Sequence, residues 1–212
     1  MKTLIKRVLA STLVLISCSY LVPVNAVASS ETTRTDGGVH VIVEKTRAEI
    51  DQEFATKFEQ LQAAFENSRT VRGPQYVYSY DYFDHETSFV EGYAGNQEFS
   101  GYRFPGGGGF LYSESGGPSV SFNVDMQLPS PFDFISLSTN LGSRSTSSGI
   151  YVPVPNTVDY FLLYVEKELE VAPYAVYRKR SGAANTEWEL YSVGGVVVDT
   201  YASYSHKNTI KI

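Results

Sequence analysis

The stretch SVSFNVDMQL, residues 119–128, alternates apolar and polar side chains without a break. The apolar set that would share one face is Val120, Phe122, Val124, Met126 and Leu128. The polar set that would share the other face is Ser121, Asn123, Asp125 and Gln127. Because successive side chains of a strand point to opposite faces, this pattern predicts a strand with one buried and one solvated face. Such strands are typical of antiparallel β proteins, and this one sets the expected fold class.

The sequence on either side has the same character. Pro129-Ser130-Pro131 predicts a turn, after which a second alternating segment would return as the antiparallel partner. The alternating residues of this partner segment are Ile135, Leu137, Thr139 and Leu141. More widely, the chain after Arg72-Gly73-Pro74 is rich in Tyr, Ser, Gly, Val and Phe, with frequent turn signals. We therefore expect one antiparallel β domain over residues 73–212.

Further strands are predicted within this domain, each with a place in the sheet. Residues 98–104 are expected to form a strand, and the uninterrupted apolar segment 160–165 a central one. Residues 174–178 would form another strand. The segment 151–155 contains two prolines, so we expect it at an edge or in a connection, because proline cannot donate to a central ladder.

The C-terminal region predicts a tight hairpin. Residues 187–191 and 196–204 have strand composition, and Gly194-Gly195 stands between them. Glycine readily adopts the positive φ angles of a two-residue hairpin turn, so we expect the chain to reverse at these glycines.

Before this domain, within residues 39–72, the spacing of the apolar residues changes from that of a strand to that of a helix. A short β-branched strand is predicted over 39–43, and Thr46-Arg47-Ala48-Glu49 fits a capping box at a helix start. The residues of the apolar stripe that follows are Ile50, Phe54, Phe58, Leu61 and Phe65. Their spacing of three and four predicts an amphipathic helix of about 20 residues. Such a stripe docks onto a sheet or, alternatively, binds a partner or a second copy.

These elements together predict a mainly β fold. We expect an antiparallel β-sandwich, or alternatively a partly closed barrel, with one N-terminal amphipathic α-helix packed on it. Residues 39–72 and 73–212 would form one globular unit, since the chain length suits a single domain.

The first 28 residues have the layout of a secretory signal peptide. A basic start precedes an apolar run from Val8 to Val24, and small residues offer cleavage after Ala26 or Ala28. We expect residues 1–28 to be removed, 29–38 to form a flexible leader, and the mature protein to be secreted. No later stretch is long and apolar enough for a membrane span.

A lipid anchor is the alternative form of export. Leu15-Ile16-Ser17-Cys18 resembles a lipobox, in which lipidation of Cys18 would hold the protein at the cell surface. The apolar residues directly after Cys18 are atypical of a lipoprotein tether, so ordinary cleavage is favoured. Cys18 is the one cysteine of the chain, so the mature protein would form no disulfide. Exported proteins without cysteine are common in Gram-positive bacteria, which we expect as the source.

The charge balance excludes some partners. The chain carries 17 Lys and Arg against 23 Asp and Glu, and three of the basic residues lie in the signal peptide. An acidic protein is not steered toward nucleic acid or anionic lipid, and the basic cluster Arg178-Lys179-Arg180 is short. We therefore expect no nucleic-acid partner.

Motifs that carry catalysis are missing. The sequence holds no G-x-S-x-G elbow, no H-E-x-x-H zinc motif, no P-loop and no dinucleotide fingerprint. The densest polar group is Asp81, Asp84, His85 and Glu86, whose spacing matches no calcium loop and predicts a solvated turn. We expect no cofactor, no metal and no enzymatic activity. A hydrolase built on two acids from distant strands is the remaining catalytic alternative.

Tyrosine is the feature most suited to ligand contact. The chain has 16 Tyr, a residue favoured where one end of the ring is buried and the other solvated. The ladder Tyr76, Tyr78, Tyr80 and Tyr82 would place four rings along one face of a strand. An exposed ladder would be a binding surface, whereas a covered one would be cross-strand packing. These four are the candidate ligand-binding residues.

The expected function is therefore an exported, non-enzymatic binding or interaction protein with an extracellular protein or carbohydrate ligand. A secreted membrane-active toxin or bacteriocin-like protein is the first alternative, because residues 119–128 would also suit a transmembrane β-hairpin arm. A binding protein predicts an exposed aromatic patch, a membrane-active protein predicts amphipathic strands held loosely over a body, and a hydrolase predicts converging acids.

Overall fold

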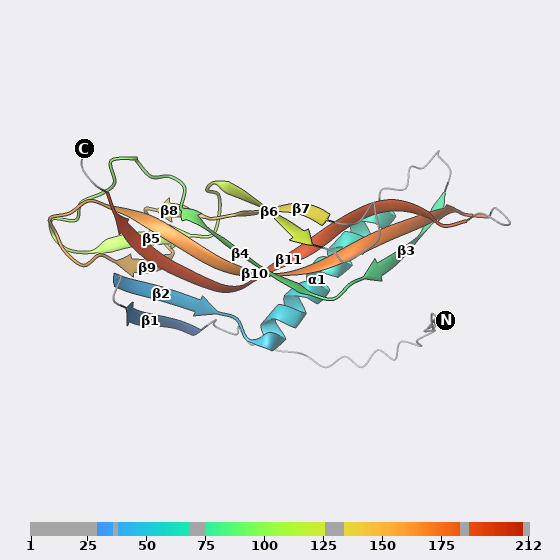
Figure 1. Cartoon of the computed structure of the whole chain (residues 1–212), viewed down its shortest axis with the longest axis horizontal. Coiled ribbons are helices and arrows are strands. Elements are labelled where there is room, and N and C mark those ends of the chain that lie inside the picture. The colour runs from blue at the N-terminus through green and yellow to red at the C-terminus, as the bar shows by residue number, and fades with distance from the viewer. Residues whose placement is uncertain (1–28, 36–37, 68–74, 126–133, 183–186, 210–212) are drawn as a thin grey trace.

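Two very long strands form the frame of the molecule (Figure 1). A computed structural model describes residues 29–35, 38–67, 75–125, 134–182 and 187–209. Within it, β10 (Phe161–Arg180) and β11 (Glu189–Asn208) are each 20 residues long and pair antiparallel over almost their whole length. At about 3.3 Å per residue, each strand spans about 65 Å.

The other strands of the main sheet lie on both edges of this pair. On one edge, β2 (Gly38–Glu44) pairs with Tyr201–Tyr204 of β11, and β1 (Ser29–Thr35) pairs with β2. On the other edge, β4 (Glu86–Tyr93) and β3 (Tyr76–Tyr82) pair with successive parts of β10. We call the part of the sheet that contains β4 the proximal half and the part that contains β3 the distal half.

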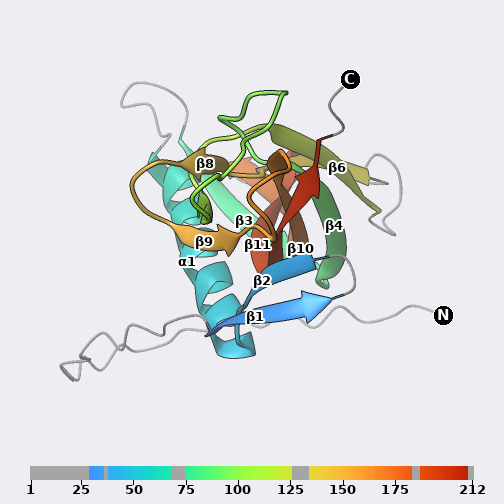
Figure 2. The same ribbon diagram turned by 90° about the vertical axis from the view of Figure 1, so that its left-hand side faces the viewer.

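Two small sheets cover one face of the proximal half. The first has the strand order β8-β5-β9, with bounds Ser143–Ser145, Gly109–Ser113 and Ile150–Pro153. The second is a hairpin of β6 (Ser119–Asp125) and β7 (Phe134–Asn140). The β10 residues fully buried beneath these sheets are Phe161, Leu163, Val165, Leu169 and Val171. Figure 2, which looks along the long strands, shows these layers end on.

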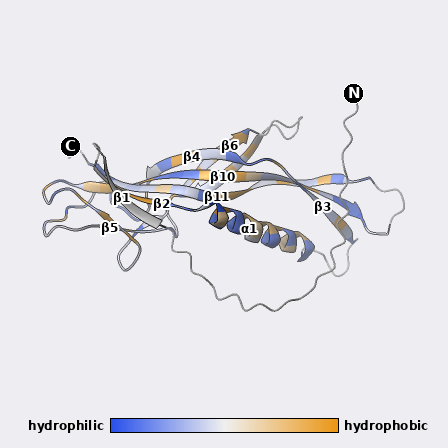
Figure 3. Cartoon of the chain, turned by 90° about the horizontal axis from the view of Figure 1, so that it is seen from below, coloured by the Kyte–Doolittle hydropathy of each residue, from blue (hydrophilic) through white to orange (hydrophobic). Residues whose placement is uncertain are grey.

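Helix α1 (Arg47–Asn67) covers the opposite face of the sheet, mainly over the distal half (Figure 3). Its buried residues Ile50 and Phe54 pack on Ala172 of β10 and on Val196 and Val198 of β11. Each face of the sheet is therefore covered over one half of its length. Among the described residues, nothing covers the proximal half on the α1 side or the distal half on the β6–β7 side.

The predicted fold class is confirmed, and so are its most regular elements. The chain is mainly β, with antiparallel sheets in sandwich-like packing and one helix in its described part. The capping box is present: the Thr46 amide donates to a Glu49 carboxylate oxygen at 2.7 Å, and the Glu49 amide donates to Thr46 Oγ1 at 3.4 Å. Val124 pairs with Ile135, as the alternation predicts. Residues 126–133, which include Pro129-Ser130-Pro131, lie outside the described residues.

The predicted turn at Gly194-Gly195 is wrong, because β11 runs straight through both glycines. Gly194 and Gly195 pair with Tyr174 and Pro173 of β10. A Cβ at Gly194 would lie 2.6 Å from the Tyr174 hydroxyl, and one at Gly195 would lie 2.7 Å from Leu137 Cδ1. These glycines therefore admit close neighbours on the two faces of a strand, rather than supplying a turn.

The predicted strands 160–165 and 174–178 are one continuous strand, β10. Pro173 is tolerated because it lies between the two edge partners of β10: the β4 pairing ends at Val171 and the β3 pairing begins at Tyr174. At this gap the missing proline N–H costs no ladder bond, while the Pro173 carbonyl accepts the Phe83 amide at 3.0 Å.

Two other predictions differ from the structure. Residues 98–104 form no strand; Gly101 has a φ of 72°, and Tyr102 makes an isolated bridge to Phe161. The flexible leader predicted over 29–38 is replaced over residues 29–35 by β1, which finds a partner along the edge of β2. The segment 151–155 lies at an edge as predicted, since β9 pairs with β5.

Candidate functional site

The predicted tyrosine ladder is brought together, and α1 lies over most of it. The ring of Tyr82 lies 4.4 Å from that of Phe58, and the Gln62 side-chain amide donates to the Tyr82 hydroxyl at 2.7 Å. The ring of Phe65 lies 6.0 Å from that of Tyr78 and 6.2 Å from that of Tyr80. The Arg178 guanidinium covers the fourth ring, that of Tyr76, at 4.6 Å. In this arrangement the ladder packs beneath a helix.

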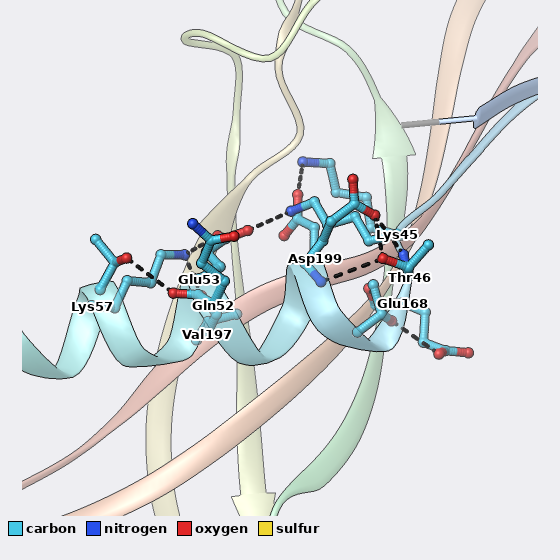
Figure 4. A network of polar contacts seen from close by, with 12 residues as sticks. Lys45, Thr46, Gln52, Glu53, Lys57, Glu168, Val197 and Asp199 are labelled. Atoms are coloured by element: carbon cyan, nitrogen blue, oxygen red, sulfur yellow. Dashed lines mark hydrogen bonds and ion pairs between the residues drawn. The ribbon is translucent and has the colours of Figure 1, made fainter. Parts of the chain in front are cut away.

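The attachment of α1 is strongest near its start (Figure 4). The Lys45 and Lys57 ammonium groups lie 2.7 and 2.6 Å from the two carboxylate oxygens of Glu53. Lys57 also donates to the Val197 carbonyl of β11 at 2.6 Å. Beyond Phe54 the helix side chains are only partly buried or exposed. A ligand that stacked on the tyrosine ladder would have to displace this second half of α1.

An aromatic and acidic surface covers the proximal half on the α1 side. Cross-strand register defines it: Phe89 pairs with Glu168, Glu91 with Glu166 and Tyr93 with Tyr164. Tyr201 of β11 pairs with Glu168 from the other side. We call this surface the open face; its residues are Phe89, Glu91, Tyr93, Tyr164, Glu166, Glu168 and Tyr201. Phe89 is 72% exposed and Tyr93 48% exposed, so described parts of the chain leave these rings accessible.

A groove of about 510 Å³ crosses the open face. Its walls are formed by Phe89, Val90, Glu91, Glu166, Lys167, Glu168 and Tyr201. A volume of this order suits a small ligand or a few side chains of a partner. The exposed Phe89 ring and the neighbouring carboxylates give the groove one apolar wall and a negative rim.

The negative charge of the open face is not balanced locally. Among the described residues, none of Glu91, Glu166 and Glu168 forms an ion pair. Lys167 lies between two of them in sequence, but it is 4% exposed and its ammonium pairs with Asp199 at 2.6 Å. The groove therefore attracts cations.

Tyr164 contributes a hydroxyl that stays protonated. Burial, together with a hydrogen bond to Glu91 and the negative charge of that carboxylate, raises the pKa of Tyr164 to about 12. The Lys207 ammonium lies 4.2 Å from the centre of the Tyr164 ring, at the far end of the open face from Phe89. This end of the surface therefore combines a hydroxyl that donates to Glu91 with a cation held on an aromatic ring.

A charged cluster lies where the start of α1 meets the sheet, next to the open face. Arg47 donates to both carboxylate oxygens of Glu170 at 2.9 Å, and His85 Nδ1 contacts the same carboxylate. Burial acts to raise the pKa of Glu170, but hydrogen bonds from His85 and Arg47 outweigh it and lower the pKa below its usual value. The ring of Phe54 lies 4.6 Å from that of His85. The cluster joins the helix start to the sheet.

The predicted polar group at 81–86 is thereby divided. His85 lies at this cluster, and Glu86 lines a second cavity of about 560 Å³, bounded by β4 and the end of β6. Asp125 is the other carboxylate of that cavity. Within the described ranges, no three His, Cys, Asp or Glu side chains are grouped as a metal site.

The open face was missed because its residues come from three strands far apart in sequence. One signal was present: Glu166, Glu168 and Glu170 alternate with Lys167 and Leu169, which places three carboxylates on one face of a strand. The pairing of Glu91 with Glu166 depends on the register of β4 against β10, which no local pattern reveals.

Two further findings concern the helix and the comparison with known proteins. In the part that the structure describes, α1 lacks an apolar stretch that could carry it across a membrane. Comparison with protein-family models, curated proteins and solved structures finds no match to this chain.

Proposed function

We propose that this chain is an exported, non-enzymatic binding protein that holds an extracellular protein through the open face. The observation that carries the proposal is the pairing of Glu91 with Glu166, beside the exposed ring of Phe89. Like charges directly opposite on neighbouring strands destabilise a sheet. A ligand that brings positive charge would relieve this repulsion, so binding compensates for an arrangement that folding alone does not favour.

The ligand that fits this surface is a basic protein segment. Lysine and arginine combine an apolar stem with a cationic end, so one side chain could cover the Phe89 ring and also reach the Glu91 or Glu168 carboxylate. A carbohydrate could stack on Phe89 or Tyr93, but it would leave the paired carboxylates uncompensated. The charge of the groove therefore favours protein over carbohydrate.

The binding test uses fluorescently labelled octa-arginine, with octaglutamate and chito-oligosaccharides as comparison probes. We expect saturable, salt-sensitive binding of octa-arginine, weakened about tenfold by Phe89→Ala. Phe99→Ala is the matched control, because Phe99 is fully exposed and is not part of the groove lining. Binding of the oligosaccharides through Phe89 would favour a carbohydrate ligand, and binding of neither would contradict the proposal.

A second variant separates function from folding. Glu91→Gln removes the repulsion with Glu166, so it should raise the free energy of unfolding by about 0.5 kcal/mol while weakening octa-arginine binding. If Glu91 instead stabilises the fold, Glu91→Gln would lower the free energy of unfolding.

Export is part of the proposal and rests on residues 1–28. The intact mass of protein from a Gram-positive host, measured in the medium and in the membrane fraction, tests it. A soluble mass that begins at Val27 or Ser29 supports secretion. A membrane-bound mass that begins at lipidated Cys18 would replace secretion with anchoring at the cell surface.

A membrane-active role is the second candidate, because one observation favours it. The β6–β7 hairpin is amphipathic and forms a sheet of its own, held to the long strands by side-chain packing alone in the described residues. Strands of this pattern could leave the body and enter a bilayer. Release of calcein from lipid vesicles by the protein would support this role; intact vesicles would leave the hairpin as a layer of the sandwich.

A further inference from the structure

The distal half of the sheet carries an exposed apolar surface on the side opposite α1. Register places its members on one face: Lys179 pairs with Val77, Tyr177 with Leu190 and Ala175 with Val193. Trp188 joins them, because its ring lies 4.7 Å from the Lys179 ammonium. We call this surface the distal patch; its residues are Val77, Tyr177, Lys179, Trp188, Leu190 and Val193.

The distal patch begins where the β6–β7 layer ends. Leu137 of β7 reaches β11 at Gly195, and from Val193 toward the strand end the described residues leave the face uncovered. The exposed fractions are 41% for Val77, 43% for Trp188, and 38% each for Leu190 and Val193. Four large apolar side chains on one face exceed the scattered exposure normal for a monomer, and such patches mark interaction sites.

Positive charge borders this surface. Among the described residues, Lys179 on this face forms no ion pair, and neither does Arg180, which lies at the strand end on the opposite face. Arg178, also on that opposite face, is neutralised by Glu189 at 2.5 Å. The chain as a whole is acidic, with a net charge of −6. An anionic surface therefore repels most of the molecule and attracts this end of it, which favours an end-on approach.

We propose that the distal patch docks onto the interface of an anionic lipid bilayer. Tryptophan favours the headgroup region, where its ring is partly buried and its N–H solvated. Leu190, Val193 and Val77 would enter the upper acyl layer, and Lys179 would extend to the lipid phosphates. The open face lies on the other half and the other side of the sheet, so docking would leave it accessible.

A second copy of the chain is the competing occupant. In a two-fold dimer through this patch, each copy presents the same surface to the other, so Lys179 of one copy would face a surface that carries a second Lys179. Like charges at an interface oppose association. Charge therefore favours lipid over self-association.

The test uses Trp188, which is the single tryptophan of the chain and so reports on this site alone. The protein without residues 1–28, the form expected after signal cleavage, is mixed with vesicles of phosphatidylglycerol and phosphatidylcholine in equal parts. We expect Trp188 emission to shift to the blue and its quenching by acrylamide to fall. Pure phosphatidylcholine should give binding weaker by about tenfold.

Two substitutions with a matched control identify the surface. Leu190→Glu should weaken vesicle binding at least about tenfold, and Lys179→Gln about fivefold. Phe99→Glu makes the same apolar-to-acidic change at a residue near the opposite end of β10 and should leave binding unchanged. Far-UV circular dichroism of each variant checks that the fold is intact.

Three outcomes would overturn the proposal. The first is unchanged Trp188 emission with anionic vesicles. The second is equal weakening by Leu190→Glu and Phe99→Glu. The third is a blue shift that follows protein concentration without lipid, together with a dimeric mass in light scattering, which would assign the patch to self-association. Octa-arginine binding to the open face is measured separately, so the two proposals can fail independently.

Discussion

The Lys167 ammonium on β10 lies 2.6 Å from a carboxylate oxygen of Asp199 on β11, and only 4% of the lysine side chain is exposed. The pair joins the two long strands on the face covered by the small sheets, directly behind the carboxylates of the open face. Removing one member of a buried pair leaves an uncompensated charge.

Asp199→Ala should therefore lower the free energy of unfolding by about 3 kcal/mol. Replacing both members, Lys167→Met with Asp199→Leu, should cost much less, because no charge is left buried. Urea denaturation of both variants measures the difference. Equal losses would mean that the pair acts through packing and not through charge.

Acid should destabilise the protein through Glu170. Its pKa is lowered in the folded state by hydrogen bonds from His85 and Arg47. A carboxylate with a folded pKa below the unfolded value stabilises the fold above about pH 5, and this contribution is lost as the pH falls through the folded pKa. Glu49 and Glu53 also have lowered pKa values and act in the same direction.

Urea denaturation at pH 7, 5, 4 and 3 tests this dependence. The free energy of unfolding should fall most below pH 5, and Glu170→Gln should flatten that fall while lowering stability at pH 7. Glu168→Gln, a change on the same face of β10, is the control and should keep the full slope. If the free energy of unfolding of Glu170→Gln fell with pH as steeply as that of the unmodified protein, Glu170 would not be a cause of the acid sensitivity.

The helix start predicts a contrast between two threonines. Thr46→Ala removes the hydroxyl that accepts the Glu49 amide and should cost about 1 kcal/mol. Thr56→Ala, in the middle of α1, removes only a hydroxyl bonded to the Gln52 carbonyl, so stability should be unchanged or slightly higher. Thermal unfolding of the two variants side by side gives the comparison, and similar losses would argue against capping.

A crowded and an uncrowded glycine can be compared in the same way. Gly195→Ala would place a methyl group 2.7 Å from Leu137 Cδ1 and 2.9 Å from Val171 Cγ1, so it should cost about 1–3 kcal/mol. A Cβ at Gly106 meets nothing within 4 Å, so Gly106→Ala should be close to neutral. A neutral Gly195→Ala would show that the β6–β7 layer moves aside easily.

Features written in short stretches of sequence were predictable. The Thr46–Glu49 box and the alternation around Val124 depend on spacings of a few residues, and both are present as expected. The stripe from Ile50 also predicted the length of α1 and its docking on a sheet.

Features set by distant partners were not predictable. Gly194-Gly195 has the composition of a turn, but its conformation is decided by Tyr174 and Leu137, which pack against it from opposite faces. The tyrosine ladder was recognised, yet whether its rings face solvent or Phe65 depends on where α1 lies. The open face likewise exists only once β4 takes its register on β10.

The long pairing of β10 with β11 also has a mechanical consequence. The two strands are hydrogen-bonded from Phe161–Asn208 to Arg178–Glu189, past two local register shifts. A force that pulls the two strands apart lengthwise is resisted by many of these bonds at once, in shear, whereas a force across the strands breaks them one after another. The molecule should therefore resist being stretched along its long strands more than it resists having the two strands peeled apart.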